Sequence, residues 1–175
     1  MAGVFTPVRA LTPTTNNNGY IGDNMRALRI EDFRSADADA LVRMWRASFE
    51  HGVGIAAPHS LEEQIEYLRT MVIPVHRVRV AKEDQSIVGF LASNGESIAQ
   101  LYVRIQDIGR GIGTRLLRLA KSESSGSLWL LTFVLNARAC RFYEHHGFVA
   151  VAHGFEPMWK LDDVKYQWVR RENAA

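Results

Sequence analysis

The sequence predicts one α/β domain of the α+β type, with three layers and about four helices on a mixed, mostly antiparallel sheet of six or seven strands. Two observations carry this prediction. Short apolar runs of strand length alternate with longer stretches of helical periodicity, in the order β-α-α-β-β-β-α-β-α-β-β. Hairpin signals also alternate with helical crossovers, which requires both antiparallel and parallel strand neighbours.

Bulk composition narrows the class of protein. A chain of 175 residues fits one domain with a buried core. The net charge of +2 and the lack of a dense Lys/Arg run argue against a nucleic-acid partner. No apolar run is long enough to span a bilayer and no signal-peptide core is present, so no membrane partner is expected. The single cysteine, Cys140, excludes an internal disulfide and fits a reducing compartment, which predicts a cytoplasmic protein.

The first half of the chain has clear boundary signals. Residues 1–24 are rich in Thr, Asn, Pro and Gly without periodicity, so we expect a flexible segment before a folded domain over 25–172. Ser35 is expected to cap a helix to about Phe49, and His51 to His59 form a loop. Ser60 and Glu63 make a capping box for a second helix.

The second half contains most of the expected strands. Asn94-Gly95 is a strong hairpin signal between two apolar segments. Residues 128–134 are so densely apolar that we expect a central strand buried on both faces. The expected strands are 26–31, 77–82, 86–93, 97–103, 128–134, 148–152 and 158–170, and a helix is expected over 136–146.

The segment from Leu101 to Leu117 carries the first chemical signal. An apolar strand is followed by glycines at Gly109, Gly111 and Gly113, and then by an apolar face at helical spacing. A glycine loop that opens a helix presents unpaired N–H groups and the positive end of the helix dipole to an anion. Arg110 adds positive charge. The segment predicts a seat for a diphosphate, whereas the alternative is a tight strand-to-helix turn with no ligand.

Two known phosphate motifs do not fit this loop. A phosphate-binding loop of NTPases needs Lys followed by Ser/Thr after its last glycine, but Thr114-Arg115 follows here. The G-x-G-x-x-G dinucleotide pattern also fails, because the sixth position from Gly109 is Thr114 and the one from Gly111 is Leu116.

A second motif follows the strand at 128–134. It is Asn136-x-x-Ala139-x-x-Phe142-Tyr143-Glu144-x-x-Gly147-Phe148. Together with the loop Gly109-Arg-Gly-Ile-Gly113, this ordered pair resembles the GNAT superfamily of acetyl-CoA-dependent N-acetyltransferases. The resemblance extends over about residues 27–171 at the level of element order. It implies that the strands at 97–103 and 128–134 are a parallel central pair that splays apart around acetyl-CoA.

The resemblance also implies roles for individual residues. Backbone groups of the first splayed strand would hold the pantetheine arm and the thioester, and the glycine loop would hold the pyrophosphate. Asn136 would bind the pantetheine arm, although a plain helix N-cap is a compatible alternative. The implied cofactor-binding residues are Leu101, Tyr102, Val103, Gly109, Arg110, Gly111, Ile112, Gly113, Thr114, Asn136, Ala139 and Phe142.

Tyr143 matches the tyrosine that this family places near the CoA sulfur. A phenol with a pKa of about 10 suits a general acid that protonates a departing thiolate. The alternative is a half-buried aromatic residue whose hydroxyl binds any neighbour. The sequence departs from the family at Ile108, where a Gln or Arg is usual, and at Ala99, where many members carry an acidic base.

The acceptor amine must lose a proton, so another base is needed. Candidates on the expected acceptor side are Glu50, His51, His59, Glu66 and Glu96, and Trp159 is a candidate for lining the acceptor cleft. Ordinary loop histidines and a core tryptophan are the alternatives. The implied acceptor is a small-molecule or peptide amine.

Other reactive residues are assigned no catalytic role. Cys140 has no partner at a spacing diagnostic of a nucleophile, so no acyl-enzyme is expected. His145 and His146 are adjacent on a helix and face different directions, so no metal site is expected. The implied function is N-acetyl transfer. The alternatives are a non-catalytic acyl-CoA sensor or scaffold, which Ala99 and Ile108 favour, and an acyltransferase with another acceptor. An exposed apolar edge among the last strands would suit a homodimer, which is common in that family.

Overall fold

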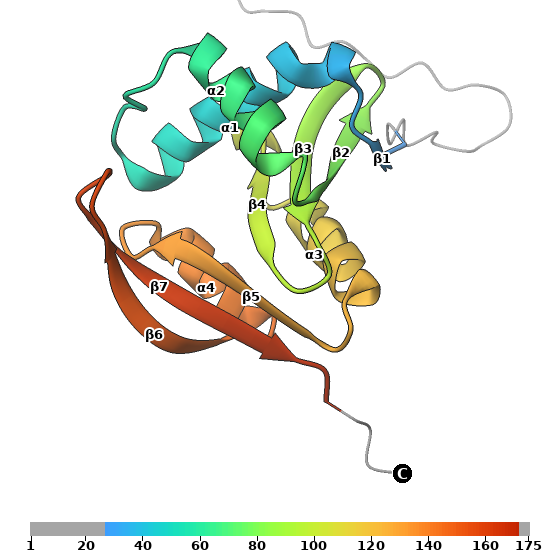
Figure 1. Ribbon diagram of the computed structural model, residues 1–175. Helices are drawn as coiled ribbons and strands as arrows, with labels where there is room; N and C mark the ends of the chain where they lie inside the picture. The colour runs from blue at the N-terminus through green and yellow to red at the C-terminus, as the bar shows by residue number, and fades with distance from the viewer. Residues whose placement is uncertain (1–26, 172–175) are drawn as a thin grey trace, which may run out of the picture.

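The computed structural model describes residues 27–171 and consists of two antiparallel sheets with helices on their faces (Figure 1). The first sheet has the strand order β1-β2-β3-β4 and the second the order β5-β7-β6. The strands are β1 (Arg29–Asp32), β2 (Arg77–Glu83), β3 (Ser86–Ser93), β4 (Ile98–Val103), β5 (Ser127–Phe133), β6 (Val149–Glu156) and β7 (Leu161–Val169). The helices are α1 (Ala38–Val53), α2 (Leu61–Tyr67), α3 (Ile112–Glu123) and α4 (Ala137–His145). This is the predicted fold class.

The two sheets meet at one point. Ser97 and Trp129 form a single parallel bridge, and the N–H of Trp129 donates to the carbonyl of Glu96 at 3.0 Å. From this bridge the ribbons of β4 and β5 diverge (Figure 1). The predicted splayed parallel pair is therefore confirmed, and its bridge is the only strand pairing between the two sheets within residues 27–171.

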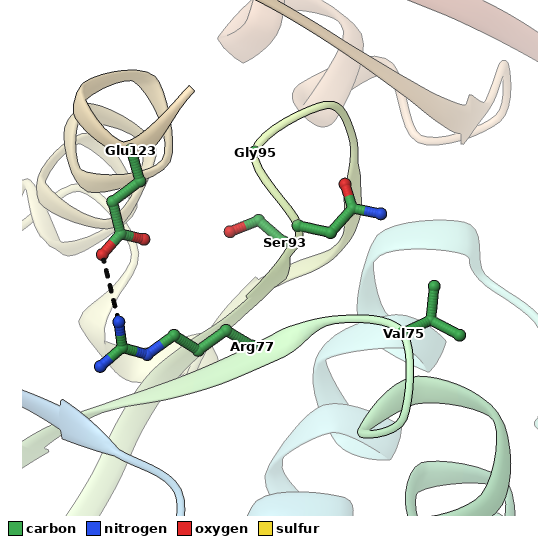
Figure 2. Close-up of a pocket in the computed structure, with 6 residues that line it drawn as sticks. Val75, Arg77, Ser93, Gly95 and Glu123 are labelled. Atoms are coloured by element: carbon green, nitrogen blue, oxygen red, sulfur yellow. Dashed lines mark ion pairs between the residues drawn. The ribbon is translucent and has the colours of Figure 1, made fainter. Parts of the chain in front are cut away.

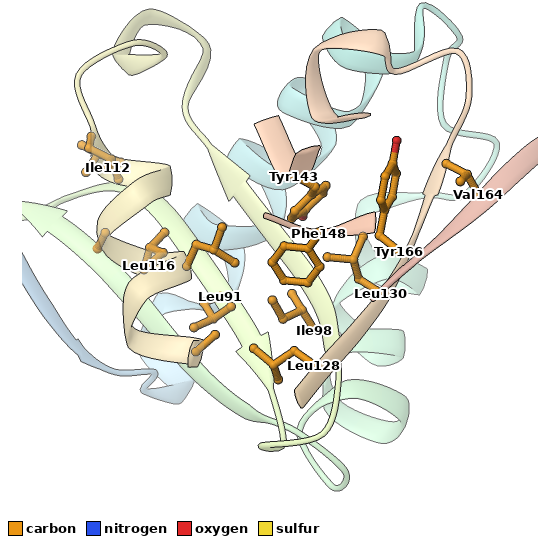
Figure 3. Packing of buried hydrophobic residues seen from close by; sticks show 14 residues of the cluster. Leu91, Ile98, Ile112, Leu116, Leu128, Leu130, Tyr143, Phe148, Val164 and Tyr166 are labelled. Atoms are coloured by element: carbon orange, nitrogen blue, oxygen red, sulfur yellow. The ribbon is translucent and has the colours of Figure 1, made fainter. Parts of the chain in front are cut away.

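Two apolar cores lie on opposite faces of the first sheet. One packs α1 and α2 on β2 and β3 around Leu41, Leu68 and Phe90, all of which are almost fully buried. The other packs α3 and α4 on β3, β5 and β7, and Figure 3 shows Leu116 of α3 beside Leu91 of β3. Since β3 contributes to both cores, it is the most deeply buried strand and fixes the position of β4 next to it.

Several expected boundaries are confirmed. The Ser60 hydroxyl accepts from the N–H of Glu63 at 3.1 Å, and the Glu63 carboxylate accepts from the N–H of Ser60 at 2.7 Å, which is the predicted capping box. The helix that it opens continues as a π-helical segment, Leu68–Val72. Strand β3 has the expected limits. No helix within residues 27–171 is both long and apolar enough to cross a bilayer.

Three expectations were wrong. Ser35 does not cap α1, because it begins a short 3-10 helix (Ser35–Asp37) and the N-cap of α1 is Asp37. Helix α1 continues to Val53 and ends at Gly54, whose φ of 80° is left-handed, so His51 lies on its last turn rather than in a loop. Strand β5 is not buried on both faces, because the side chains of Trp129 and Leu131 are 40% and 54% exposed. β5 pairs with β7 on one edge, and its apolar residues face water on the outer side. The segment 1–24, predicted to be flexible, lies outside the described residues.

Candidate functional site

The diverging edge of β4 carries backbone groups that no strand within residues 27–171 pairs. Arg104 donates to the carbonyl of Val88 on β3 at 2.9 Å, and Val103 lies opposite Gly89. Because bonded and non-bonded pairs alternate along an antiparallel ladder, Leu101 and Val103 turn their N–H and C=O groups away from β3 and toward β5. The carbonyl of Val103 accepts from the buried Ser48 hydroxyl of α1 at 3.0 Å. The N–H of Val103 faces the gap.

The glycine loop presents a cluster of free backbone donors. Gly109 and Gly111 have φ values of 90° and 80°, a backbone conformation that favours glycine. No hydrogen bond within residues 27–171 uses the N–H groups of Gly109, Gly111, Ile112, Gly113 and Thr114, whereas Arg115 donates back to Gly111 at 3.0 Å. These five donors lie at the N-terminus of α3, where the helix dipole is positive. We call them the amide cradle, and their arrangement suits an anion.

The side chain of Arg110 is directed away from the amide cradle. Its guanidinium binds the buried carboxylate of Glu83 at 2.7 Å and also binds buried Asp107. The N–H of Arg110 donates to the carbonyl of Asp107 at 3.3 Å. Burial raises the pKa of Asp107, but hydrogen bonds from Arg104 and Arg110 outweigh this and hold that pKa below its ordinary value. The guanidinium and the backbone N–H of Arg110 therefore both form hydrogen bonds that stabilise the glycine loop.

Helix α4 lies beside the amide cradle, where His146 contacts Thr114 and the Phe142 ring packs on Gly113. The Asn136 carboxamide oxygen accepts from the N–H of Ala139 at 3.1 Å, so the N-cap interpretation of this residue is confirmed. A Cβ added to Gly52 of α1 would lie 2.8 Å from the Asn136 amide nitrogen, which places the end of α1 against that side chain. The Phe142 ring packs on Gly113 of the amide cradle, at 3.4 Å from the position of an added Cβ. The cradle and the start of α4 thus border one gap.

Tyr143 is 6% exposed and belongs to the core beneath this gap. Its ring centroid lies 5.6 Å from that of Phe148 and 6.2 Å from that of Tyr166 (Figure 3). Burial raises the pKa of Tyr143 above its ordinary value, with smaller contributions from Tyr102 and Cys140. No hydrogen bond to its hydroxyl occurs among the described residues. The phenol therefore stays protonated at neutral pH and is able to donate.

Four rings meet at the far end of β5. The Trp159 centroid lies 4.7 Å from that of Phe49 on α1, 6.2 Å from that of Phe133 on β5 and 6.0 Å from that of His59. The structure brings together two predicted acceptor residues, His59 and Trp159. Phe49 and Phe133 were missed, because each fits an ordinary core pattern in its own element and only the tertiary structure joins them.

The remaining candidate bases are scattered. Glu50 follows Phe49, and its carboxylate accepts from the N–H of Ala57 at 2.9 Å. His51 is exposed on the last turn of α1. Glu66 pairs with Arg69 on the exposed side of α2. Glu96 lies in the turn next to the Ser97–Trp129 bridge, where β4 and β5 are joined rather than apart.

Known proteins share both the sequence and the architecture of this region. The family model of an acetyltransferase (GNAT) domain matches residues 74–150, which contain the amide cradle and the start of α4. Over residues 74–150 the sequence is that of an acetyltransferase (GNAT) domain. A search of curated protein sequences gave no match.

Solved structures extend the likeness to most of the chain. YjaB from Escherichia coli, in its apo form, has a TM-score of 0.69 at 21% identity over 83% of this chain and 99% of its own. An acetyltransferase from Thermus thermophilus has a TM-score of 0.67 at 22% identity, over 81% of this chain and 96% of its own. The putative acetyltransferase yncA from Salmonella typhimurium, solved with acetyl-CoA, has a TM-score of 0.63 at 18% identity, over 85% of this chain and 97% of its own. These structures share the fold, and the acetyltransferase (GNAT) match over residues 74–150 indicates an acyltransferase.

Cys140 and the possible metal-ligating side chains are the remaining groups with reactive or ligand chemistry. The Cys140 sulfur lies 3.9 Å from the Phe133 carbonyl, among core residues. Within residues 27–171, no group of three or more His, Cys, Asp or Glu side chains could hold a metal ion.

A separate pocket of about 420 Å³ lies at the C-terminal end of α3 (Figure 2). The Arg77 guanidinium spans it toward the Glu123 carboxylate at 3.9 Å, and no predicted site residue lines it. Its lining residues are Val75, Arg77, Ser93, Asn94, Gly95 and Glu123.

Proposed function

We propose that this protein is an N-acetyltransferase that moves an acetyl group from acetyl-CoA to a primary amine, with the amine reacting directly and no acyl-enzyme forming. The observation that carries the proposal is the amide cradle, whose five free N–H groups follow a strand with a free edge toward β5. One structural neighbour, yncA, was solved with acetyl-CoA.

The residues present fit acetyl-CoA. The amide cradle would bind the pyrophosphate through backbone donors, which need no side chain at Ile108. The free edges of Leu101 and Val103 would pair with the amides of the pantetheine arm, together with the Asn136 carboxamide, while Ala139 and Phe142 line the same side. When bound, acetyl-CoA supplies an acetyl group activated as a thioester.

Two groups of this chain would act on the reacting atoms. The N–H of Val103 would donate to the thioester carbonyl, and the Ser48 hydroxyl holds the adjacent carbonyl of Val103 in place. The Tyr143 phenol would give its proton to the departing sulfur, since its raised pKa keeps it protonated at neutral pH.

The acceptor is proposed to be a small-molecule or peptide amine that enters beside Trp159 and His59. Either Glu50 or His59 would take the amine proton, directly or through water, because Ala99 offers no base. Replacement of the true base, as Glu50→Gln or His59→Gln, should lower kcat/KM at pH 7 by about 10²-fold and shift the rate profile toward alkaline pH. Equal profiles for both variants and the wild type would reject both residues.

The absence of an acyl-enzyme is supported by the surroundings of Cys140, which packs against the core and has no histidine or carboxylate bonded to it among residues 27–171. Cys140→Ser is expected to retain acetyl transfer, whereas a loss of turnover with intact folding would indicate a covalent route.

The test is release of free thiol from acetyl-CoA across a panel of primary amines. Tyr143→Phe should lower kcat by about 10²-fold or more while CoA affinity, measured by calorimetry, is kept. Tyr67→Phe, which changes an exposed tyrosine of α2, is the matched control. Binding of CoA without turnover of any amine would favour the sensor alternative, and failure to bind CoA would reject both functions.

The oligomeric state and the location in the cell are also proposals. We propose a homodimer through strand β6, an edge strand with exposed Val149, Val151 and Phe155, because such edges readily pair with a second chain. Light scattering should then give twice the chain mass, and Val151→Lys should give a monomer. A cytoplasmic location is supported by the single, unpaired cysteine.

A further inference from the structure

We propose that His146 is a positioning residue of the amide cradle, and that its imidazole takes up a proton when a diphosphate binds there. This proposal takes only its ligand, the diphosphate of CoA, from the proposed function, and it rests on that function to this extent. It starts from Thr114, which belongs to the cradle through its N–H and contacts His146 through its side chain.

The hydrogen bonds of His146 define its tautomer. Its Nδ1 lies 2.7 Å from the carbonyl oxygen of Phe142, which only accepts, so Nδ1 carries a hydrogen. In the neutral ring, Nε2 therefore has no hydrogen and must accept. Its neighbour is the Thr114 hydroxyl at 3.1 Å. The single hydrogen of that hydroxyl consequently points at His146, and only its lone pairs are left for any other neighbour.

This arrangement is unfavourable for an anion on the cradle. A phosphate oxygen that approaches Thr114 gains the free N–H but meets a hydroxyl that offers only lone pairs. Addition of a proton to Nε2 reverses the bond, because Nε2–H then donates to the Thr114 oxygen. The hydroxyl hydrogen is released and can donate to phosphate. The proton comes from solvent and stays on the imidazole, so the diphosphate keeps its charge.

The contacts around His146 hold the ring in this position. Its centroid lies 4.4 Å from that of Phe142, whose ring in turn packs on Gly113 of the cradle. The Lys121 ammonium donates to the His146 carbonyl at 2.6 Å. The other charged or titratable side chains on the adjoining turns of α3 and α4 are Arg115, Arg118, Arg138, Cys140, Arg141, Tyr143, Glu144 and His145. Glu144 accepts from the Tyr166 hydroxyl at 2.6 Å. Because four arginines and Lys121 outnumber this carboxylate, the turns around the ring carry mostly positive charge. This positive charge favours an anion on the neighbouring cradle.

Neutral and charged imidazole exchange between about pH 5 and 8, so the linkage is measurable near neutrality. The experiment is calorimetric titration of the full chain with dephospho-CoA at pH 7.5, in buffers of different ionisation enthalpy. Dephospho-CoA keeps the diphosphate and lacks the 3′-phosphate, which could itself take up a proton. We expect uptake of about half a proton or more on binding, and affinity that rises about threefold to tenfold for each pH unit lowered.

His146→Gln should abolish the uptake, and His145→Gln, at the exposed neighbouring position, should leave it unchanged. Thr114→Val removes the hydroxyl without adding charge and should also reduce the uptake, which keeps the proposal testable if His146→Gln folds poorly. Dephospho-CoA that binds the wild type without proton uptake would overturn the role of His146 and leave the proposed function intact. Proton uptake with CoA but none with dephospho-CoA would assign the linkage to the 3′-phosphate and overturn the proposal as well. If neither ligand binds, the proposed function itself falls.

Discussion

Ser48 on α1 donates a hydrogen bond of 3.0 Å to the carbonyl of Val103, the last residue of β4. This bond joins α1 to the end of β4 that lies farthest along the strand from its bridge to β5. It also satisfies a carbonyl that no described strand pairs, so it fixes the position of Val103, whose N–H points away from β3.

Ser48→Ala removes this bond and leaves the Val103 carbonyl without its donor. We expect the free energy of unfolding to fall by about 1–2 kcal/mol and kcat to fall several-fold, while dissociation of CoA changes little. Urea unfolding and steady-state kinetics measure both effects. The control is Ser122→Ala, which removes a hydroxyl bond of 2.8 Å to the Leu119 carbonyl on the exposed side of α3. Equal losses of stability and kcat in the two variants would show that the Ser48 bond matters no more than an ordinary exposed hydroxyl bond.

The two roles of Asn136, the helix cap made by its oxygen and CoA binding by its amide nitrogen, can be tested separately. Asn136→Asp keeps an oxygen for the N–H of Ala139 but loses the amide donor, whereas Asn136→Ala loses both. We expect the alanine variant to lose about 1 kcal/mol of stability and the aspartate variant almost none. If the amide binds the pantetheine arm, both variants weaken CoA binding by about tenfold. Unchanged CoA affinity in the aspartate variant would reduce Asn136 to a cap.

Arg110 provides a test of the loop itself. Its guanidinium neutralises two buried carboxylates, Glu83 and Asp107, so Arg110→Met leaves both without this partner. We expect thermal unfolding at a midpoint lower by about 5 °C or more, with a smaller loss for Arg118→Met on the exposed side of α3. Direct binding of phosphate by Arg110 would instead weaken CoA affinity while the midpoint stays the same.

Alkaline stability should depend on Tyr102. Burial between Trp45 and Phe90 raises the pKa of Tyr102 to about 12, although a hydrogen bond from Trp45 opposes this. Because the unfolded phenol ionises first, near pH 10, the free energy of unfolding should be unaffected below that pH and fall between about pH 10 and 12. Tyr102→Phe should remove part of this fall. Urea titrations at pH 9 and 11 compare the two proteins, and identical losses would contradict the assignment.

Local signals predicted much of this fold correctly. The Ser60–Glu63 capping box and the Asn94-Gly95 hairpin each act within a few residues, so the sequence alone specifies them. The glycine loop was likewise predictable, because Gly109 and Gly111 are needed for backbone angles that other residues adopt poorly.

The errors and omissions arose where distant residues meet. Glu83, the partner of Arg110, lies 27 positions earlier in the chain, so no local pattern indicated that the arginine would be held in the loop. The outer residues of β5 looked like core because they are apolar, and only the structure shows Trp129 and Leu131 facing water. The group of rings around Trp159 combines four separate segments. Spacing in one sequence could not predict it.

The single bridge between Ser97 and Trp129 has a consequence for amide hydrogen exchange. The N–H groups of Leu101 and Val103 lie in the middle of the domain yet on an unpaired strand edge, so they should exchange with deuterium much faster than those of β3. Protection of these two amides from exchange would show that acetyl-CoA is bound, without any need to measure turnover. Slowed exchange at these two amides together with Gly109 to Thr114, and little change in the four-stranded sheet, would outline the bound donor residue by residue.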